Sequence, residues 1–110
     1  MKLPNREFAY VPQTKLKDYL LSETHVVGRS KAKFFRLFGF DEKNIEVLQQ
    51  GLVKIAQTQD IKDEFPSSHG KKYVINGTLS TPIGKSVKIE TVWIIDKGQE
   101  KPRFITAYPD

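Results

Sequence analysis

The densest group of chemically capable side chains in this sequence lies between His25 and Arg36. This run contains one histidine, one glycine and four cations, and it contains no acid. An imidazole transfers protons near neutral pH, while guanidinium and ammonium groups bind phosphate oxygens. The composition of the run therefore indicates a place where a phosphate group is handled.

A helix that begins near Ser30 would position these side chains, because successive residues are about 100° apart around a helix axis. This spacing separates three cations from three aromatic rings, Arg29, Lys33 and Arg36 against Phe34, Phe35 and Phe38. Lys31 falls inside the aromatic stripe. We expect it either to extend along apolar surface to solvent or to point into a partly buried anion site at the helix start. The alternative is a solvated basic face with a lysine at its rim.

Positive charge is concentrated toward the two ends of the chain. Residues 1–40 carry 8 Lys/Arg against 3 acids, residues 41–70 carry 3 against 6, and residues 71–110 carry 7 against 4. Basic domains of this size commonly bind nucleic acid or an acidic protein. The acidic middle is then expected to face away from a bound polyanion. Ordinary charge scatter is the other interpretation of a net charge of +5.

Composition excludes several other classes. The sequence has 110 residues, no cysteine and 2 histidines far apart, so we expect one domain spanning residues 1–110, without disulfides, thiolate chemistry or a metal site. No apolar run approaches the roughly 20 residues of a membrane span, and the first residues lack the apolar core of a signal peptide. The expected location is cytoplasmic, without membrane contact, and no cofactor is expected.

Hydrophobic periodicity predicts helices first and strands second. Helical spacing begins after Pro12 and continues to about residue 21, returns at residues 30–38, and runs from residue 41 or 44 to about 59. The segment DEFPSSHG is interpreted as a loop, and strands are predicted at KKYVINGTL, KSVKIETVWII and RFITAY, with EFAYV as a further edge strand. The fold class is therefore α+β, with three N-terminal helices packed on one face of a C-terminal antiparallel sheet of three to four strands.

Strand alternation suggests which side chains face away from the helices. One register puts Val92, Ile94, Ile105 and Ala107 under the helices and leaves four residues on an open surface, namely Thr91, Trp93, Thr106 and Tyr108. Hydroxyls and rings beside cations suit an unstacked base and its phosphate. Trp93 and Tyr108 can equally be core or rim aromatics whose polar tips are satisfied within the protein.

Several motifs resemble a small bacterial domain family of unknown function. The segments HVVGRSKAKFFRLFGF, KKYVINGTL, TVWII and FITAYP are similar to a pattern that has LPN near its start, a histidine before G-R-x-K-A-x-F-F, and a terminal T-A-Y-P. The resemblance covers residues 3–109 but implies no reaction. The layout also resembles the barnase–EndoU–colicin–RelE ribonuclease toxins, by analogy of fold only.

Metal-independent RNA cleavage requires a base for the 2′-hydroxyl, an acid for the leaving 5′-oxygen, and cations beside the phosphate. We predict an endoribonuclease of bacterial toxin type, with these catalytic residues: His25, Arg29, Lys31, Thr106 and Tyr108. The predicted substrate-binding residues are Lys33, Arg36, Lys72, Thr91 and Trp93. His69 is a second candidate histidine or an ordinary surface residue, and His25 would also suit a structural position in a loop.

A non-catalytic basic module that binds RNA or an acidic partner protein is the alternative function. Catalysis requires His25, Lys31 and a sheet hydroxyl to converge on one point, whereas binding tolerates their dispersal. If the chain is a toxin, an acidic neutralising protein is also expected as a partner. A purely structural subunit is a third interpretation.

Overall fold

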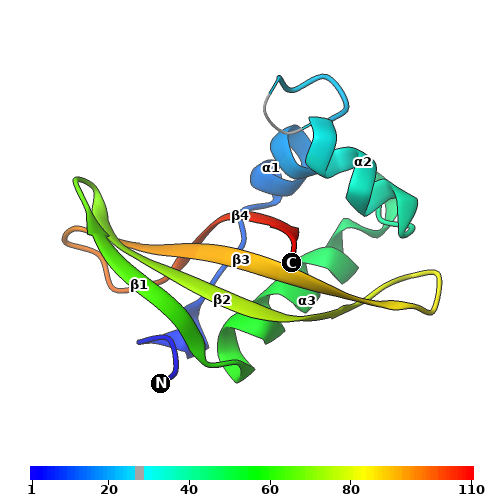
Figure 1. Cartoon of the computed structure of the whole chain (residues 1–110). Helices are drawn as coiled ribbons and strands as arrows, with labels where there is room; N and C mark the ends of the chain where they lie inside the picture. The colour runs from blue at the N-terminus through cyan, green and yellow to red at the C-terminus, as the bar shows by residue number, and fades with distance from the viewer. Residues whose placement is uncertain (27–28) are drawn as a thin grey trace.

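A helical N-terminal half precedes a four-stranded antiparallel sheet in the computed structural model of the chain, which describes residues 1–26 and 29–110 (Figure 1). The helical elements are η1 (Arg6–Phe8), α1 (Gln13–Lys15) continued by the π-turn η2 (Leu16–Leu20), α2 (Arg29–Leu37), η3 (Glu42–Asn44) and α3 (Ile45–Thr58). The strands are β1 (Ile61–Ser67), β2 (Gly70–Ser80), β3 (Ser86–Asp96) and β4 (Arg103–Pro109), in the order β1-β2-β3-β4. The predicted α+β class and helix-before-strand order are confirmed. Within the described residues, no helix has the length and apolarity needed to cross a membrane.

Local sequence signals set the ends of the helices. Gly39 follows α2 with a φ of +93°, a conformation that glycine adopts without a Cβ penalty. Asp41 and Asn44 then form a capping box before α3: Asp41 accepts from the Lys43 N–H at 2.8 Å, and the Asn44 side chain accepts from the Asp41 N–H at 2.9 Å. These contacts give partners to N–H groups at the start of the helical segment that continues as α3.

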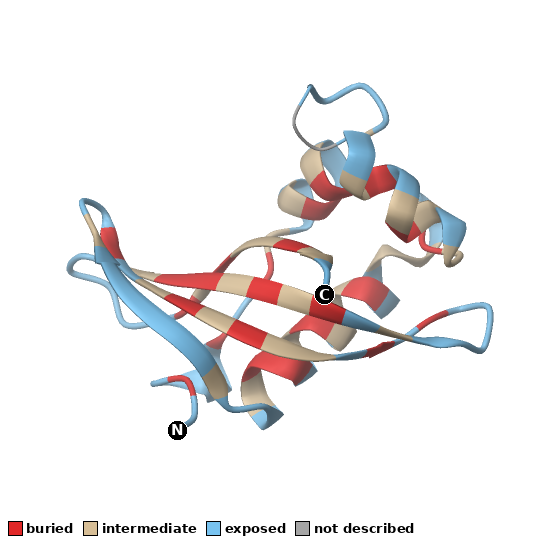
Figure 2. Ribbon diagram, in the orientation of Figure 1, coloured by how far each residue is buried: buried red, intermediate tan, exposed pale blue. Residues whose placement is uncertain are grey.

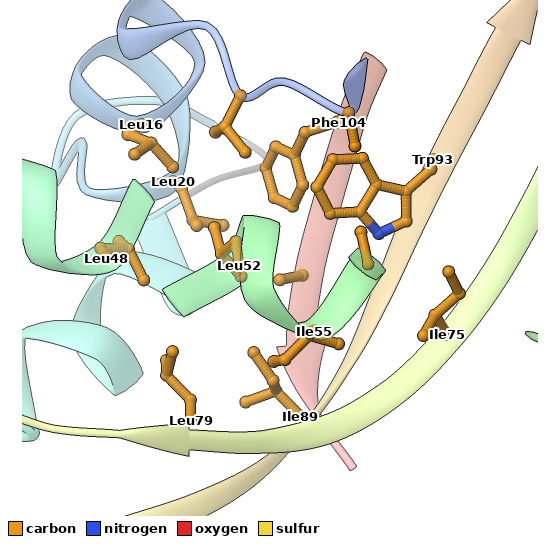
Figure 3. Packing of buried hydrophobic residues seen from close by; sticks show 14 of the residues in the cluster. Leu16, Leu20, Leu48, Leu52, Ile55, Ile75, Leu79, Ile89, Trp93 and Phe104 are labelled. Atoms are coloured by element: carbon orange, nitrogen blue, oxygen red, sulfur yellow. The ribbon is translucent and has the colours of Figure 1, made fainter. Parts of the chain in front are cut away.

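The core lies between α3, the first helical segment and the inner face of the sheet (Figure 3). Leu48, Leu52 and Ile55 of α3 are buried, with Ile55 so close to β2 that a Cβ on Gly77 would lie 2.8 Å from its side chain. Buried positions alternate with more exposed ones along β2 and β3 (Figure 2), as expected for a sheet with one covered face.

The prediction that DEFPSSHG (residues 63–70) forms a loop is wrong, because most of this segment belongs to the edge strand β1. Its residues are mostly exposed and include Asp63 and Pro66, which are depleted in strands but tolerated at a sheet edge. The predicted edge strand EFAYV is also wrong. Phe8 ends η1, and Tyr10 makes only an isolated parallel bridge to Arg103.

The register predicted for β3 is wrong as well. Thr91 and Trp93 are fully buried on the helix-covered face, and Ala107, which pairs with Thr91, is buried there as predicted. The indole Nε1 of Trp93 donates to Thr91 Oγ1 at 2.8 Å, and Thr91 Oγ1 donates to the Ile75 carbonyl at 2.6 Å. Since each polar atom has a partner, the pair is buried without an unsatisfied group. Neither residue is on an open surface.

Candidate functional site

Tyr19 is the centre of a half-buried polar group that joins three distant parts of the chain. Its hydroxyl shares a hydrogen bond of 3.2 Å with Thr106 Oγ1. The His25 ring meets the Tyr19 ring edge-on, with 5.0 Å between centroids. The Nζ atoms of Lys15 and Lys31 lie 4.7 and 5.5 Å from the Tyr19 ring centroid. We call these five residues the Tyr19 cluster.

The members of the cluster are positioned by the first helical segment, the start of α2 with the loop before it, and β4. Lys15 and Tyr19 are four residues apart on the continuous helical segment that α1 and η2 form, so their side chains lie on one face. Lys31 belongs to the first turn of α2, and Thr106 belongs to the edge strand β4. His25 is tied to the start of α2, because its carbonyl accepts the Arg29 N–H at 2.9 Å.

The surroundings of Tyr19 change its acidity. Burial raises the pKa of the Tyr19 phenol, but the hydrogen bond to Thr106 and the positive charges of Lys31 and Lys15 outweigh burial and bring this pKa below its ordinary value. A phenol of lowered pKa releases its proton more readily than an ordinary tyrosine does. The same two ammonium groups attract an anion such as a phosphate.

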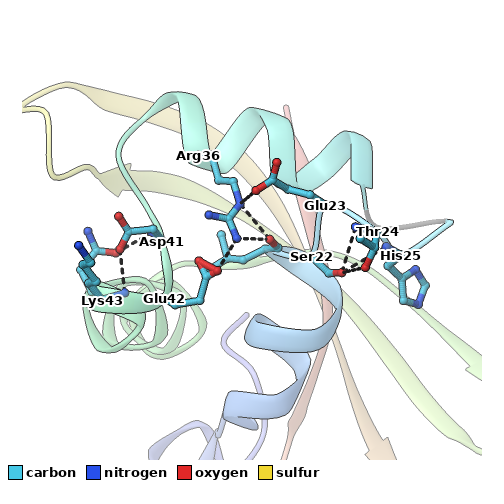
Figure 4. A network of polar contacts seen from close by, with 10 residues as sticks. Ser22, Glu23, Thr24, His25, Arg36, Asp41, Glu42 and Lys43 are labelled. Atoms are coloured by element: carbon cyan, nitrogen blue, oxygen red, sulfur yellow. Dashed lines mark hydrogen bonds and ion pairs between the residues drawn. The ribbon is translucent and has the colours of Figure 1, made fainter.

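The side chain of Arg36 binds other parts of the protein and does not extend freely into solvent. Its guanidinium donates to the Leu21 carbonyl from Nε at 3.0 Å and from Nη2 at 2.6 Å. It also pairs with Glu42 at 2.6 Å and with Glu23 at 3.3 Å (Figure 4). We call these contacts of Arg36 with Leu21, Glu23 and Glu42 the Arg36 clamp. In the same view the Ser22–Thr24 turn lies between the Arg36 clamp and His25. The guanidinium of Arg36, which the sequence predicted to bind substrate, is therefore held by protein partners in the structure.

Arg29 and Lys33 lie on the other side of α2 from Lys31. Together with Glu23, Ser30 and Arg36 they line an open cleft of about 530 Å³. Helical geometry separates them from the Tyr19 cluster, because Lys31 follows Arg29 by about 200° around the axis. Two of the predicted cations are thus exposed and basic, but they are not directed at Tyr19.

Tyr108 and Lys72 lie on the uncovered face of the sheet. The Tyr108 hydroxyl donates to Glu90, which also pairs with Lys62 at 2.8 Å. This hydrogen bond, together with burial, raises the pKa of Tyr108 to about 12, so its phenol holds its proton firmly. Lys72 pairs in register with Ile94. His69 is exposed in the β1–β2 turn, where its carbonyl accepts the Lys97 N–H at 2.9 Å.

The structure thus brings together three of the five predicted catalytic side chains, His25, Lys31 and Thr106. The residue around which they gather, Tyr19, was missed because its spacing with Leu16 and Leu20 assigns it to an apolar helical stripe. One signal was available in the sequence. Lys15 and Tyr19 have the spacing at which a cation and a ring meet on a helix.

Comparisons with known proteins agree with this architecture. The model of DUF6883, a domain of unknown function, matches residues 2–110, so the chain belongs to this family. Comparison with curated proteins gives no significant match. The fold is similar to a chain in the structure of a contact-dependent growth inhibition toxin–immunity protein complex from Klebsiella pneumoniae 342, with a TM-score of 0.72, 18% identity, and 96% of each chain covered.

Proposed function

We propose that this member of the DUF6883 family is a metal-independent endoribonuclease of toxin type that acts at the Tyr19 cluster. The observation that carries the proposal is the meeting of His25, Lys31 and Thr106 at one phenol, although the three residues come from a loop, a helix and a strand. Convergence of this kind is what catalysis requires and simple binding does not. Similarity of fold to a chain of a growth-inhibition toxin–immunity complex also supports a toxin.

In the proposed reaction, His25 is the base and Tyr19 is the acid. The His25 imidazole takes the proton of the RNA 2′-hydroxyl, and the resulting 2′-oxygen forms a bond to the adjacent phosphorus. The bond from phosphorus to the 5′-oxygen breaks, and the phenol of Tyr19 gives its proton to that oxygen. The products are a 2′,3′-cyclic phosphate and a 5′-hydroxyl. Solvent then returns the proton from imidazolium to phenolate, so neither group is consumed.

Lys15 and Lys31 stabilise the charge that this reaction develops. Negative charge accumulates on the phosphoryl oxygens and then on the phenolate of Tyr19, and both ammonium groups lie over the Tyr19 ring, beside this charge. The hydroxyl of Thr106 holds the phenol in one orientation. Arg29, Lys33 and Lys72 are proposed to contact RNA phosphates away from the cleaved bond. Four residues of the sequence-based prediction are given no part in the chemistry, namely Arg36, Thr91, Trp93 and Tyr108.

A neutralising protein with an acidic surface is the proposed partner. An unrestrained ribonuclease would harm the cell that makes it, and the solved structure of similar fold is of a toxin with its immunity protein. The lysines of the Tyr19 cluster and the exposed Arg29 and Lys33 suit such a surface. Because these contacts are ionic, affinity should fall as salt is added.

The test is cleavage of RNA in excess EDTA by purified wild type and three variants. Tyr19→Phe and His25→Ala are each expected to lower the rate by about 10²–10⁴, the usual contribution of a general acid or base. Lys31→Met should also lose activity while its methylene packing is kept. Matched controls are His69→Ala and Lys54→Met, which alter an exposed histidine and an exposed lysine far from the cluster along the chain.

Tyr108→Phe separates the two tyrosines. Loss of activity with Tyr108→Phe but not with Tyr19→Phe would move the chemistry to the uncovered sheet face and overturn the proposed site. No cleavage of any RNA by the wild type would favour the non-catalytic binding module.

A further inference from the structure

A second cleft lies at the end of the sheet where β3 turns into β4, which is the end away from α2 (Figure 1). Its volume is about 630 Å³, within the range of small-molecule sites. It is lined by Phe8, Tyr10, Asp96, Lys97, Gln99 and Lys101. None of these residues belongs to the Tyr19 cluster.

Hydrogen bonds to backbone carbonyls hold both walls of this cleft in place. Asn5 adopts a left-handed conformation with φ 55°, and its side-chain amide donates to the Glu100 carbonyl at 3.0 Å. Tyr10 donates its N–H to the Pro102 carbonyl at 3.0 Å. On the other wall, the Lys97 N–H donates to the His69 carbonyl at 2.9 Å. The cleft is therefore formed before any ligand arrives.

Two aromatic rings stand exposed in this cleft. Phe8 is 54% and Tyr10 is 42% exposed, whereas the intervening Ala9 and the following Val11 are only 8% and 3% exposed. The small apolar residues thus anchor the segment to the core, and the rings alternate with them toward solvent. Two exposed rings that line the same cleft indicate a binding surface more than a packing defect.

The charge of the cleft favours an anion. Its one lining carboxylate, Asp96, is neutralised by Arg103, whose Nη2 and Nε lie 3.1 and 3.2 Å from the two carboxylate oxygens. Lys97 and Lys101 form no ion pair with any residue in the described ranges 1–26 and 29–110. Two ammonium groups are therefore available beside the two rings.

We propose that this cleft binds an unstacked base of single-stranded RNA on Phe8 and Tyr10, with the neighbouring phosphates held by Lys97 and Lys101. Rings that stack on bases beside cations that track the backbone are the usual means of binding a single strand. We name RNA because the proposed function is a ribonuclease, and to that extent the inference rests on the proposed function. β4 begins at Arg103, beside Tyr10, and includes Thr106 of the Tyr19 cluster. A single RNA strand can therefore follow this edge of the sheet from the cleft to the Tyr19 cluster.

The experiment measures binding of a fluorescent 2′-O-methyl single-stranded oligonucleotide by anisotropy, at several salt concentrations. This strand has no free 2′-hydroxyl and cannot be cleaved by the proposed reaction. Phe8→Ala and Tyr10→Ala should each weaken binding by about 5- to 150-fold, the usual effect of removing a stacking ring. Phe65→Ala is the matched control, because Phe65 is a ring of similar exposure, 41%, on the edge strand β1.

The lysine variants have a different expected signature. Lys97→Gln and Lys101→Gln should each lower the slope of log K against log salt by about 0.7, since one phosphate contact to a single strand is lost. The ring variants should leave that slope unchanged. Lys85→Gln, in the distant β2–β3 hairpin, is the control.

Three results would overturn the inference. The first is equal affinity of wild type and both ring variants. The second is equal binding of a fully paired duplex, whose bases are not free to stack. The third is binding of polyglutamate that depends on Phe8 and Tyr10, which would assign the cleft to an acidic protein. A wild type that binds the strand as expected but cleaves no RNA would refute the proposed function and leave the cleft assignment standing.

Discussion

Replacing Thr91 by Val removes the hydroxyl that joins Trp93 to the sheet backbone. The Trp93 indole N–H, which is fully buried, loses its acceptor, and a buried donor without a partner costs about 1–3 kcal/mol. The hydrogen bond to the Ile75 carbonyl contributes roughly a further 1 kcal/mol. We therefore expect the free energy of unfolding to fall by about 2–4 kcal/mol.

Thermal unfolding followed by near-ultraviolet circular dichroism checks this expectation. For a domain of this size, the loss corresponds to a fall in Tm of roughly 8–16 °C. Thr91→Ser keeps the hydroxyl and is the control. In a Trp93→Phe background, which lacks the indole N–H, the cost of Thr91→Val should shrink to roughly 1 kcal/mol. An unchanged Tm in Thr91→Val, together with weaker RNA binding, would refute the buried pair and support the open surface inferred from sequence.

Three further predictions concern charged and titrating groups. Arg36→Met should lower Tm clearly more than Lys33→Met, because Arg36 connects the Leu21 carbonyl to Glu42 of η3. Equal Tm values of the two variants would contradict a stabilising role of these Arg36 contacts. Because folding raises the pKa of Tyr108 to about 12, stability is fully present below pH of about 10 and should fall as pH rises from there through 12. A urea titration of Tyr108→Phe should lack this alkaline loss. Ultraviolet titration should detect the Tyr19 phenol ionising below the ordinary tyrosine pKa, as a signal absent from Tyr19→Phe, and Lys31→Met should shift that ionisation upward.

The elements whose hydrophobic residues recur at regular helical or strand spacing could be predicted from the sequence. α3 carries its buried leucines at helical spacing between a capping box and the strand region, and β2 to β4 are rich in β-branched and aromatic residues. β1 lacked both signals. β1 forms because its backbone pairs with the edge of β2. Such pairing requires no hydrophobic pattern in β1, which is mostly exposed and contains Asp63 and Pro66.

The site was predictable only in part, for a related reason. Charge and position drew attention to His25 and Lys31, whose side chains both lie beside the Tyr19 ring. Tyr19 itself is placed by the π-turn η2 and by a hydrogen bond to Thr106, 87 residues away. Neither has a local signature, and single π-turns recur at functional sites. The prediction of which face of β3 is buried was wrong because the indole N–H of Trp93 donates a hydrogen bond to the Thr91 hydroxyl. This hydrogen bond allows both polar groups to be buried, whereas isolated polar groups would not be.

The most direct measurement of the central claim is the identity of the RNA ends formed by wild type and by Tyr19→Phe in excess EDTA. With single-stranded RNA and mass spectrometry of the fragments, we expect wild type to yield 2′,3′-cyclic phosphate and 5′-hydroxyl ends, and Tyr19→Phe, folded and binding RNA, to yield them at a rate lower by about 10²–10⁴. Wild-type protein that leaves the RNA intact, or Tyr19→Phe protein that cleaves as fast as wild type, would contradict the account.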